Sequence, residues 1–203
     1  MLSTSLCDLQ AMVDICCVEL EKVDMNLNVK KSQIIRIGKS HSKAVNDVVI
    51  GGKHVDYVDE LKYLGWYILS ANVFCINVHH MQVRFFQCFN SQYAKSNNLS
   101  EPVLQHLLNV YCKPYLLHAA DVINWTESEL SSLRFTLNSS MCKIYKVKFQ
   151  SLGIIYKYTN QMDVADVIKN RQTNFMLKLQ TCSNLVIKAN LQCYCLLTVL
   201  CIV

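Results

Sequence analysis

Leu61-Lys-Tyr-Leu-Gly-Trp-Tyr-Ile-Leu69 is the stretch of sequence that decides the fold of this chain. Its aromatic and aliphatic residues are typical of a strand, and we expect one strand that is broken or bulged at Gly65. Upstream of it, Gly51-Gly52-Lys53 lies between two short apolar runs, which is the pattern of a β-hairpin. The β-branched run Gln33-Ile-Ile-Arg-Ile-Gly38 predicts a further strand. Residues 33–69 therefore predict a small antiparallel sheet.

Helices are predicted on both sides of this sheet. Ser5 to Asp24 has apolar residues at spacings of three and four, and Ser5 with Asp8 resembles a capping box. After Ser70 the periodicity indicates four helices, over residues 77–93, 101–118, 127–147 and 163–182. Pro114 is expected to kink or end the second of these, and Thr126 to cap the third. The predicted fold class is α+β.

The change in pattern also predicts the domain organisation. Residues 1–70 form a segment of one helix, strands and a hairpin, residues 71–182 form a mostly helical region, and residues 183–203 form an apolar tail. The apolar run Leu191–Val203 is shorter than the roughly 20 residues that a spanning helix needs. We therefore expect a buried or frayed terminal segment there rather than a membrane anchor.

Composition and charge narrow the class of protein. Hydrophobic residues make up 52% of the chain and charged residues 17%, which argues against a disordered protein. The net charge of +5 divides into −4 over residues 1–24 and +9 over residues 25–203. A basic body is attracted to the phosphates of nucleic acid or to an anionic membrane, although a merely solvated surface has the same composition.

Cysteine usage indicates an intracellular protein, in the cytoplasm or the nucleus. The eleven cysteines are odd in number and follow no spacing typical of a disulfide scaffold. No Cys-x-x-Cys pair occurs, so we expect no zinc site. The N-terminal sequence has no basic segment followed by an apolar run, as a signal peptide would. We expect reduced thiols packed as small apolar side chains.

Two short segments, together with their order along the chain, carry a resemblance to a known family. The first is Leu27-Asn28 followed by Lys31-Ser32, after an amphipathic helix, and the second is Lys62-Tyr-Leu-Gly65. Further on, Cys112-Lys-Pro114 precedes Leu116-Leu117-His118. Over about residues 1–150 the chain resembles the reverse transcriptase of non-LTR (LINE-type) retrotransposons, from the end of the palm into the thumb.

The resemblance implies a fold, an activity and several site residues. The fold would be the end of a polymerase palm, a helix plus a small antiparallel sheet, followed by a thumb-like helical region. The activity of the family is RNA-directed DNA polymerisation on an RNA or DNA template–primer, with Mg²⁺ in the intact enzyme. Asn28 and Lys31 would lie near the incoming nucleotide. The primer grip would be formed by Tyr63, Leu64, Gly65 and Trp66.

The catalytic motif of that family is missing from this sequence. Its tyrosine/phenylalanine–alanine–aspartate–aspartate box is expected just before the first helix. Met1-Leu-Ser-Thr4 occupies the stretch that would follow the box, and the chain has no adjacent pair of aspartates. The nearby carboxylates Asp56, Asp59 and Glu60 do not replace two aspartates on the correct strands. We therefore expect no catalytic residue, no metal ligand and no cofactor in this fragment. The chain is expected to be a truncated retrotransposon reverse transcriptase, inactive alone unless a partner chain supplies the aspartates.

One basic stretch predicts contact with nucleic acid. No acidic residue lies between Glu129 and Asp163, while basic and aromatic residues alternate there, which suits phosphate contact and base stacking. The candidate binding residues are Arg134, Lys143, Lys146 and Lys148, interleaved with Lys157, Tyr145, Phe149, Tyr156 and Tyr158. Tyr145 falls on the apolar stripe of its helix, so at least one of these aromatics is expected in the core.

A different class of function stays open at this point. The chain could be a non-catalytic helical interaction module, or an unselected fragment, with no role in nucleic-acid binding. Under either reading the sequence suggests no small-molecule substrate, and it leaves the oligomeric state undecided.

Overall fold

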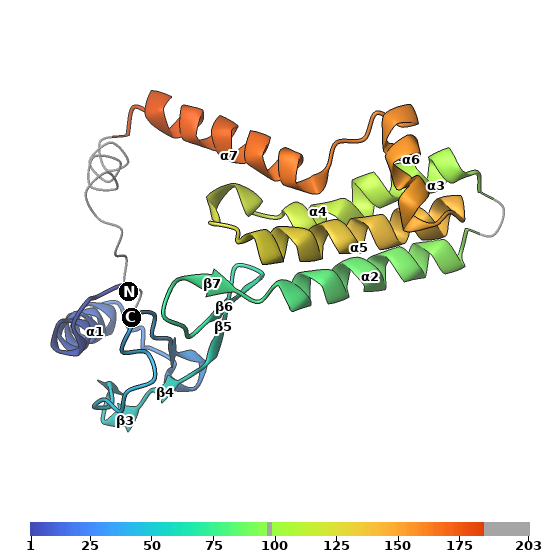
Figure 1. Cartoon of the computed structure of the whole chain (residues 1–203). Helices are drawn as coiled ribbons and strands as arrows, with labels where there is room; N and C mark the ends of the chain where they lie inside the picture. Colours follow the sequence, from blue (N-terminus) through green and yellow to red (C-terminus); the bar gives the residue numbers. More distant parts are fainter. Residues whose placement is uncertain (97–98, 185–203) are drawn as a thin grey trace. The chain divides into compact units, whose positions relative to one another are not determined.

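The computed structural model describes residues 1–96 and 99–184 of the chain. The fold is α+β, and the described residues divide into two compact units, one ending at Asn77 and the other beginning at Val78 (Figure 1). The first unit combines a helix with short strands, and the second is built of helices.

The first unit begins with α1 (Leu6–Glu21) and a 3₁₀ turn, η1 (Val29–Lys31). Seven short strands follow: β1 (Gln33–Ile34), β2 (Val49–Ile50), β3 (Lys53–His54), β4 (Asp56–Tyr57), β5 (Glu60–Tyr63), β6 (Trp66–Leu69) and β7 (Cys75–Ile76). They form an antiparallel pair β2–β3, an antiparallel three-stranded sheet β5–β6–β7, and a parallel pair β1–β4. The parallel pair departs from the single antiparallel sheet that we predicted.

The stretch that decides the fold is a hairpin rather than one strand. Tyr63 pairs with Trp66, and the two residues between them, Leu64 and Gly65, have φ angles of 48° and 91°. Positive φ at both central residues is the signature of a type I′ turn, which matches the twist of the flanking strands. The predicted interruption at Gly65 is confirmed, but it is a hairpin turn between two strands rather than a break within one. The turn was missed because Leu64, which has positive φ, is not a glycine. The predicted hairpin at Gly51–Gly52 is confirmed.

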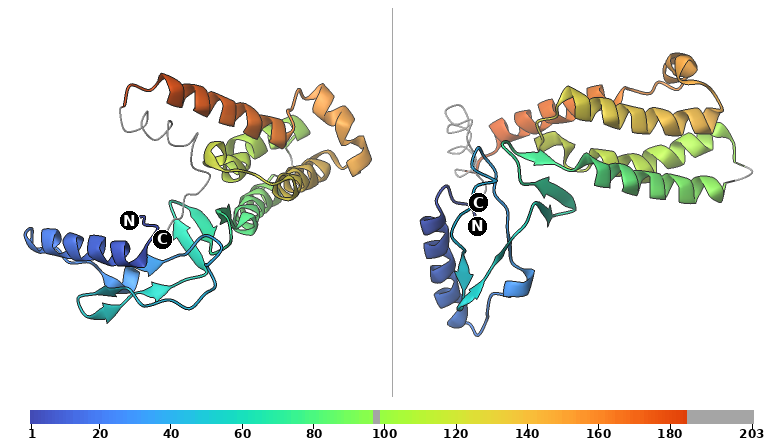
Figure 2. Two further views of the ribbon diagram at one scale, coloured as in Figure 1. Left: turned by 60° about the vertical axis from the view of Figure 1, so that its left-hand side comes forward. Right: turned by 60° about the horizontal axis from the view of Figure 1, so that its bottom comes forward.

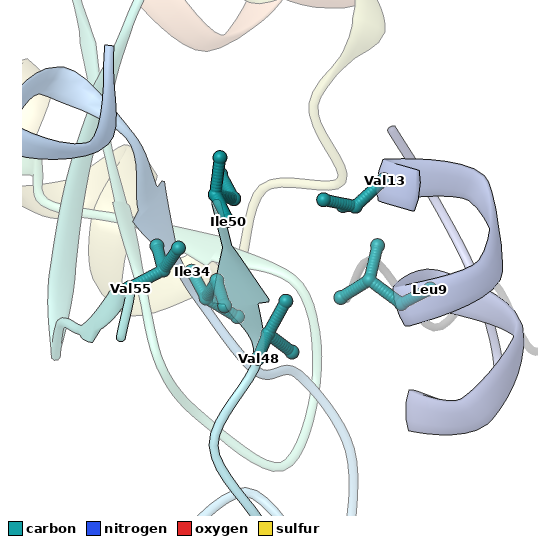
Figure 3. Close-up of a cluster of buried hydrophobic side chains, with 6 residues drawn as sticks. All are labelled: Leu9, Val13, Ile34, Val48, Ile50 and Val55. Atoms are coloured by element: carbon teal, nitrogen blue, oxygen red, sulfur yellow. The ribbon is translucent and has the colours of Figure 1, made fainter. Parts of the chain in front are cut away.

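The segment from Ile34 to Ile37 divides the apolar interior of this unit in two. Successive residues of an extended chain point to opposite faces. Ile34 accordingly joins one buried cluster, whereas Ile35 and Ile37 join a second with Ile68 of β6. Figure 3 shows the first cluster, in which two residues of α1 face the strands; its members are Leu9, Val13, Ile34, Val48, Ile50 and Val55.

A side chain of α1 also fastens the helix to β2. The Gln10 Nε2 donates a hydrogen bond to the carbonyl of Val49 at 2.8 Å, and the Val49 N–H donates to Gln10 Oε1 at 2.8 Å. The predicted helix is thus confirmed, but its predicted capping box is wrong. Ser5 is the N-cap residue and its side chain makes no capping hydrogen bond, while its N–H donates to the hydroxyl of Ser3 at 3.1 Å.

The second unit confirms the predicted helices and adds one. Its elements are α2 (Val78–Ala94), α3 (Glu101–Leu107), the π-helix η2 (Leu108–Cys112), α4 (Lys113–Leu117), η3 (Ala120–Val122), α5 (Glu127–Tyr145), η4 (Phe149–Ser151), α6 (Leu152–Tyr158) and α7 (Val164–Thr181). Thr126 caps α5 in a full capping box with Glu129, and Asp163 caps α7 through the N–H of Ala165. The helix α6 was not predicted, because it has only 7 residues.

The helices α2 and α5 run side by side in the core of this unit (Figure 2). Met81, Phe85 and Phe89 of α2 are buried at spacings of four. On α5 the buried set includes two polar residues, and comprises Leu133, Thr136, Leu137, Ser140, Met141 and Ile144. The amide of Gln82 serves the polar part by donating to the hydroxyls of Ser132 and Thr136 at 2.9 and 2.6 Å. The buried hydroxyl of Thr136 therefore has the partner that burial requires.

The segment between α3 and α4 shows how the chain accommodates Pro114. Proline has no N–H and its ring clashes with the carbonyl four residues back, so a regular helix cannot run through it unchanged. Here the helix widens into a π-helix before the proline, and the N–H of Lys113 donates to the carbonyl of Leu108, five residues back. The predicted break at Pro114 is thus a change of helix type rather than an end.

Two further features bear on the compartment and on the cysteines. Over residues 1–96 and 99–184, no helix combines the length and the apolarity needed to cross a bilayer. The eight cysteines in the same ranges are free thiols. The predicted apolar tail at 183–203 lies almost wholly outside the described residues.

The turn at Leu64 yields a stability prediction. Left-handed backbone costs an ordinary side chain about 1 kcal/mol, whereas Asn-Gly is a favoured type I′ pair. We expect Leu64→Asn to raise the free energy of unfolding by up to about 1 kcal/mol in urea denaturation. Gly65→Ala should lower it by a similar amount. A destabilising Leu64→Asn would mean that the exposed leucine contributes more to the fold than its turn conformation costs.

Candidate nucleic-acid interface

The candidate interface lies where α5 ends. The helix stops at Lys146, whose left-handed φ of 53° turns the chain into Val147 and Lys148. Lys146 and Lys148 are both exposed, and neither has a carboxylate partner in the part of the chain that the structure describes. A bend that carries two lysines within three residues presents their charges to solvent, where a phosphate can approach both.

Arg134, the third predicted cation, is held by an ion pair. Its Nε lies 2.7 Å from Oδ2 of Asp163, the residue that caps α7. Burial alone would raise the pKa of the Asp163 carboxyl, but the hydrogen bonds from Arg134 and from the N–H of Ala165 outweigh burial and lower it. The pKa of the Arg134 guanidinium is raised, chiefly by the hydrogen bond to Asp163. This pair therefore ties α5 to the start of α7.

Lys143, the fourth predicted cation, lies against aromatic rings of α2. Its Nζ is 4.8 Å from the ring centroid of Tyr93 and 5.6 Å from that of Phe89. It also donates a hydrogen bond to Oδ1 of Asn90 at 3.1 Å. Cation–π contacts of this kind hold the ammonium at the α2–α5 interface. The lysine remains exposed, but its contacts serve helix packing.

The aromatic residues of the stretch separate into two groups. Tyr145 and Tyr156 are half-buried, and their hydroxyls donate to Gln105 Oε1 and to Asn138 Oδ1, the latter at 2.6 Å. Burial, with the neighbouring charge of Asp163, raises the pKa of Tyr156 to about 12. Neither tyrosine is among the fully buried core residues, so the expectation of a core aromatic holds only as partial burial. Tyr158, in contrast, is 85% exposed.

Phe149 belongs to the exposed group and has a stacking partner. Its ring lies parallel to that of Phe135, with centroids 5.6 Å apart and an interplanar angle of 16°, although both residues are exposed. We call Lys146, Lys148, Phe135 and Phe149 the basic strip. Exposed rings beside lysines are the combination that binds a flexible, single-stranded backbone and its bases.

Phe135 was missed from the sequence, although a signal for it exists. It falls between Leu133 and Leu137, off the apolar stripe of α5, and a large apolar residue at such a position is exposed unless another element covers it. Nothing in the spacing of residues 135 and 149 foretells that their rings meet. That contact depends on the left-handed turn at Lys146.

The predicted nucleotide-proximal residues lie in the first unit. Asn28 is the N-cap of η1 and Lys31 is its last residue, and both are exposed. The Asn28 carbonyl accepts hydrogen bonds from the N–H groups of Lys31 and Ser32 at 3.0 Å each. This compact turn leads directly into β1.

The predicted primer-grip residues form the hairpin of β5 and β6. Tyr63 and Leu64 are 60% and 75% exposed, whereas Trp66 is buried. The structure therefore makes Tyr63 and Leu64 the accessible tip and Trp66 part of the packing. Asn28 and Lys31 belong to the turn before β1. That strand pairs with β4, whereas the hairpin tip belongs to the sheet of β5, β6 and β7.

The resemblance implies Mg²⁺ for the intact family, so the carboxylates near the hairpin would have to lie close together to bind it. Within residues 1–96 and 99–184 no three histidine, cysteine or acidic side chains gather closely enough to hold a metal ion. Glu60 accepts a hydrogen bond from the Asn77 amide at 2.7 Å, and Asp56 lies on β4 in a different sheet. These residues do not fit a two-metal site.

Compared with known protein families, with curated proteins and with solved structures, the chain matches none of them.

The ion pair of Asp163 predicts a pH dependence of stability. Because the pKa of this carboxyl is lower in the folded chain, its contribution is present above the unfolded value near 3.9 and is lost as the pH falls below it. Asp163→Asn keeps a side chain that can cap α7 but removes the charge. We expect it to lower the free energy of unfolding at pH 7 by about 0.5 kcal/mol, an effect that vanishes below about pH 3.

Asp166→Asn is the matched control, since Asp166 is exposed in the first turn of the same helix. Urea unfolding of both variants at several pH values measures the difference. An Asp163→Asn effect that stays constant from pH 7 to pH 3 would contradict the ion-pair explanation.

Proposed function

We propose that this chain is a non-catalytic part of a LINE-type reverse transcriptase, and that it binds nucleic acid through the basic strip. The single observation that carries the binding proposal is the stacked, exposed Phe135–Phe149 pair beside Lys146 and Lys148. The family assignment is supported by the two sequence segments, Leu27-Asn28 with Lys31-Ser32 and Lys62–Gly65. The palm and thumb assignments of the two units are part of this proposal.

The chemistry of the strip favours contact that is independent of base sequence. Lysine is a point charge that binds a phosphate without reading a base, and every base offers a flat face to an aromatic ring. Exposed rings of this size are otherwise unfavourable in water, so a stacked base would remove apolar surface from solvent. The absence of acidic residues from 130 to 162 keeps repulsion of the backbone low.

The proposal assigns binding to the chain but no polymerase chemistry. The sequence has no adjacent aspartates, and the three carboxylates near the hairpin lie on separate sheets or in the turn between them. The residues Tyr63 and Leu64 would then present a hairpin tip of the primer-grip type without a reactive centre beside it.

The strip predicts how binding responds to substitution and to salt. Replacing Lys146 and Lys148 by Gln should weaken binding of a fluorescent 20-nucleotide single strand, measured by anisotropy. If both lysines contact phosphates, the slope of log affinity against log salt should fall in magnitude by about 1.4. Phe149→Ala should cost about 1–3 kcal/mol of binding and leave the salt slope unchanged.

Lys169→Gln with Lys178→Gln is the charge-matched control, because both lysines are exposed on α7 of the same unit. This control should change affinity and slope by less than the strip variant. If the two double variants weaken binding equally, the net charge of the chain explains the binding and the basic strip does not. Binding that is absent at low salt would favour the helical interaction module instead.

Primer extension tests the assignment as non-catalytic. With an RNA template, a DNA primer, nucleotides and Mg²⁺, we expect the isolated chain to add no nucleotide, at enzyme concentrations where an intact reverse transcriptase extends the primer fully. Extension that persists in the Lys146→Gln, Lys148→Gln variant and after repurification would show an active polymerase and overturn the assignment.

A further inference from the structure

A cavity in the helical unit has no part in the proposed function. It has a volume of about 270 Å³ and lies between the π-helix and α4, the loop that follows α4, and α7. Its polar lining consists of Asn109, Lys113, His118 and Arg171, together with the backbone of Ala119. These residues lie outside the basic strip and were not singled out as a site from the sequence.

Lys113 is the residue that points to a ligand. Burial lowers the pKa of its ammonium, and no charged group compensates for the burial. Its one hydrogen bond is long, 3.5 Å to the amide oxygen of Gln161, and no carboxylate pairs with it among the described residues. Lys113 is half-buried, and a partly buried ammonium is more stable with an anion beside it than with an amide oxygen alone. An anion in the adjoining cavity would supply the missing partner.

Arg171 brings a second, fixed cation to the same cavity. Its Nε lies 2.8 Å from Oδ1 of Asp121, which belongs to η3. Asp121 Oδ1 has no hydrogen-bond partner, so this contact is a close ion pair without hydrogen-bond geometry. A guanidinium carries five N–H donors, which a phosphate can approach. Lys113 and Arg171 in the lining, with Asp121 as the one carboxylate paired to them, leave a net positive charge at the cavity.

We propose that this cavity binds the phosphate group of a small phosphate ester. Its two cations come from different elements, Lys113 from α4 and Arg171 from α7. A phosphate has three terminal oxygens in a tetrahedral arrangement and can meet such donors, whereas a planar carboxylate offers two oxygens in one plane. The volume is at the lower limit of usual ligand pockets, which suits a small ester rather than a large cofactor.

Titration calorimetry at pH 7 with inorganic phosphate, a nucleoside 5′-monophosphate and acetate tests the proposal. We expect phosphate to bind with a Kd on the order of 1 mM and acetate at least about tenfold more weakly. Tighter binding of the monophosphate than of phosphate identifies an ester as the ligand, and equal binding identifies free phosphate. If neither phosphate compound gives a heat of binding at concentrations tenfold above the expected Kd, the proposed site is wrong.

Lys113→Met should weaken phosphate binding at least about tenfold, since it removes the unpaired charge and keeps much of the apolar stem. Lys178→Met on α7 is the charge-matched control and should leave binding unchanged. Circular dichroism establishes that each variant is folded. If Lys178→Met weakens binding as much as Lys113→Met, the effect is one of net charge and the proposed site is wrong.

A labelling experiment on the unmodified chain keeps the proposal testable if Lys113→Met does not fold. An amine-reactive acetylating reagent modifies the neutral form of lysine, and mass spectrometry of peptides locates the modification. Phosphate at 10 times its Kd should slow acetylation of Lys113 several-fold and leave Lys178 unaffected. Equal protection of both lysines, or of neither, contradicts a phosphate bound beside Lys113.

Discussion

On the edge of β2 that does not face β3, the amide of Gln10 makes the hydrogen bonds that a neighbouring strand would make. The packing of the first unit depends on this contact between helix and strand. A two-residue strand has too few backbone hydrogen bonds and too little apolar surface to stand alone. Gln10 satisfies both backbone groups of Val49, and Leu9 and Val13 on the same helix cover the apolar side of the strands. Helix and sheet therefore stabilise each other, because neither has a sufficient core alone.

In the second unit, two ion pairs supplement a small apolar contact in holding the last helix. Arg134 joins α5 to the cap of α7, and Arg171 joins α7 to η3. Only two residues of α7 itself are buried, Val164 and Ile168. Exposed ion pairs contribute little each, so the capping hydrogen bond and the two ion pairs together matter for this helix. Lys146 and Lys148 at the end of α5, and Lys113 beside the cavity, lie outside these ion pairs.

Much of the fold could be predicted from the sequence, because periodicity depends on local spacing. The helices at 77–93, 127–147 and 163–182 were predicted within a residue or two, since their apolar stripes are long. The hairpin at Gly51–Gly52 was predicted because two glycines announce positive φ. The hairpin at Leu64 was not, and the parallel pairing of β1 with β4 could not be, since strand pairing depends on contacts across the sequence.

The candidate sites, like the fold, combine features that local spacing predicts with features that depend on contacts between residues distant in sequence. The spacing of lysines and aromatics located the end of α5, but it could not tell that Arg134 and Lys143 are engaged with Asp163 and with the rings of α2. The partners of these cations lie 29 residues ahead and about 50 residues behind in sequence. The cavity beside Lys113 could not be predicted from the sequence, because the burial of a lysine depends on residues that pack around it in the folded chain.

The π-helix before Pro114 determines in which direction the side chains of α4 and of the loop after it point. Each residue added to a helix turns its successors by about 100°. Leu108, Cys112 and Leu116 are buried at spacings of four along this segment. A π-helix turns by less per residue than an α-helix, so it changes the direction in which the side chains after it point. Removing a single residue from it would swing Lys113 and His118 away from α7, so one deletion would move the cavity's donors while leaving every one of them in the chain.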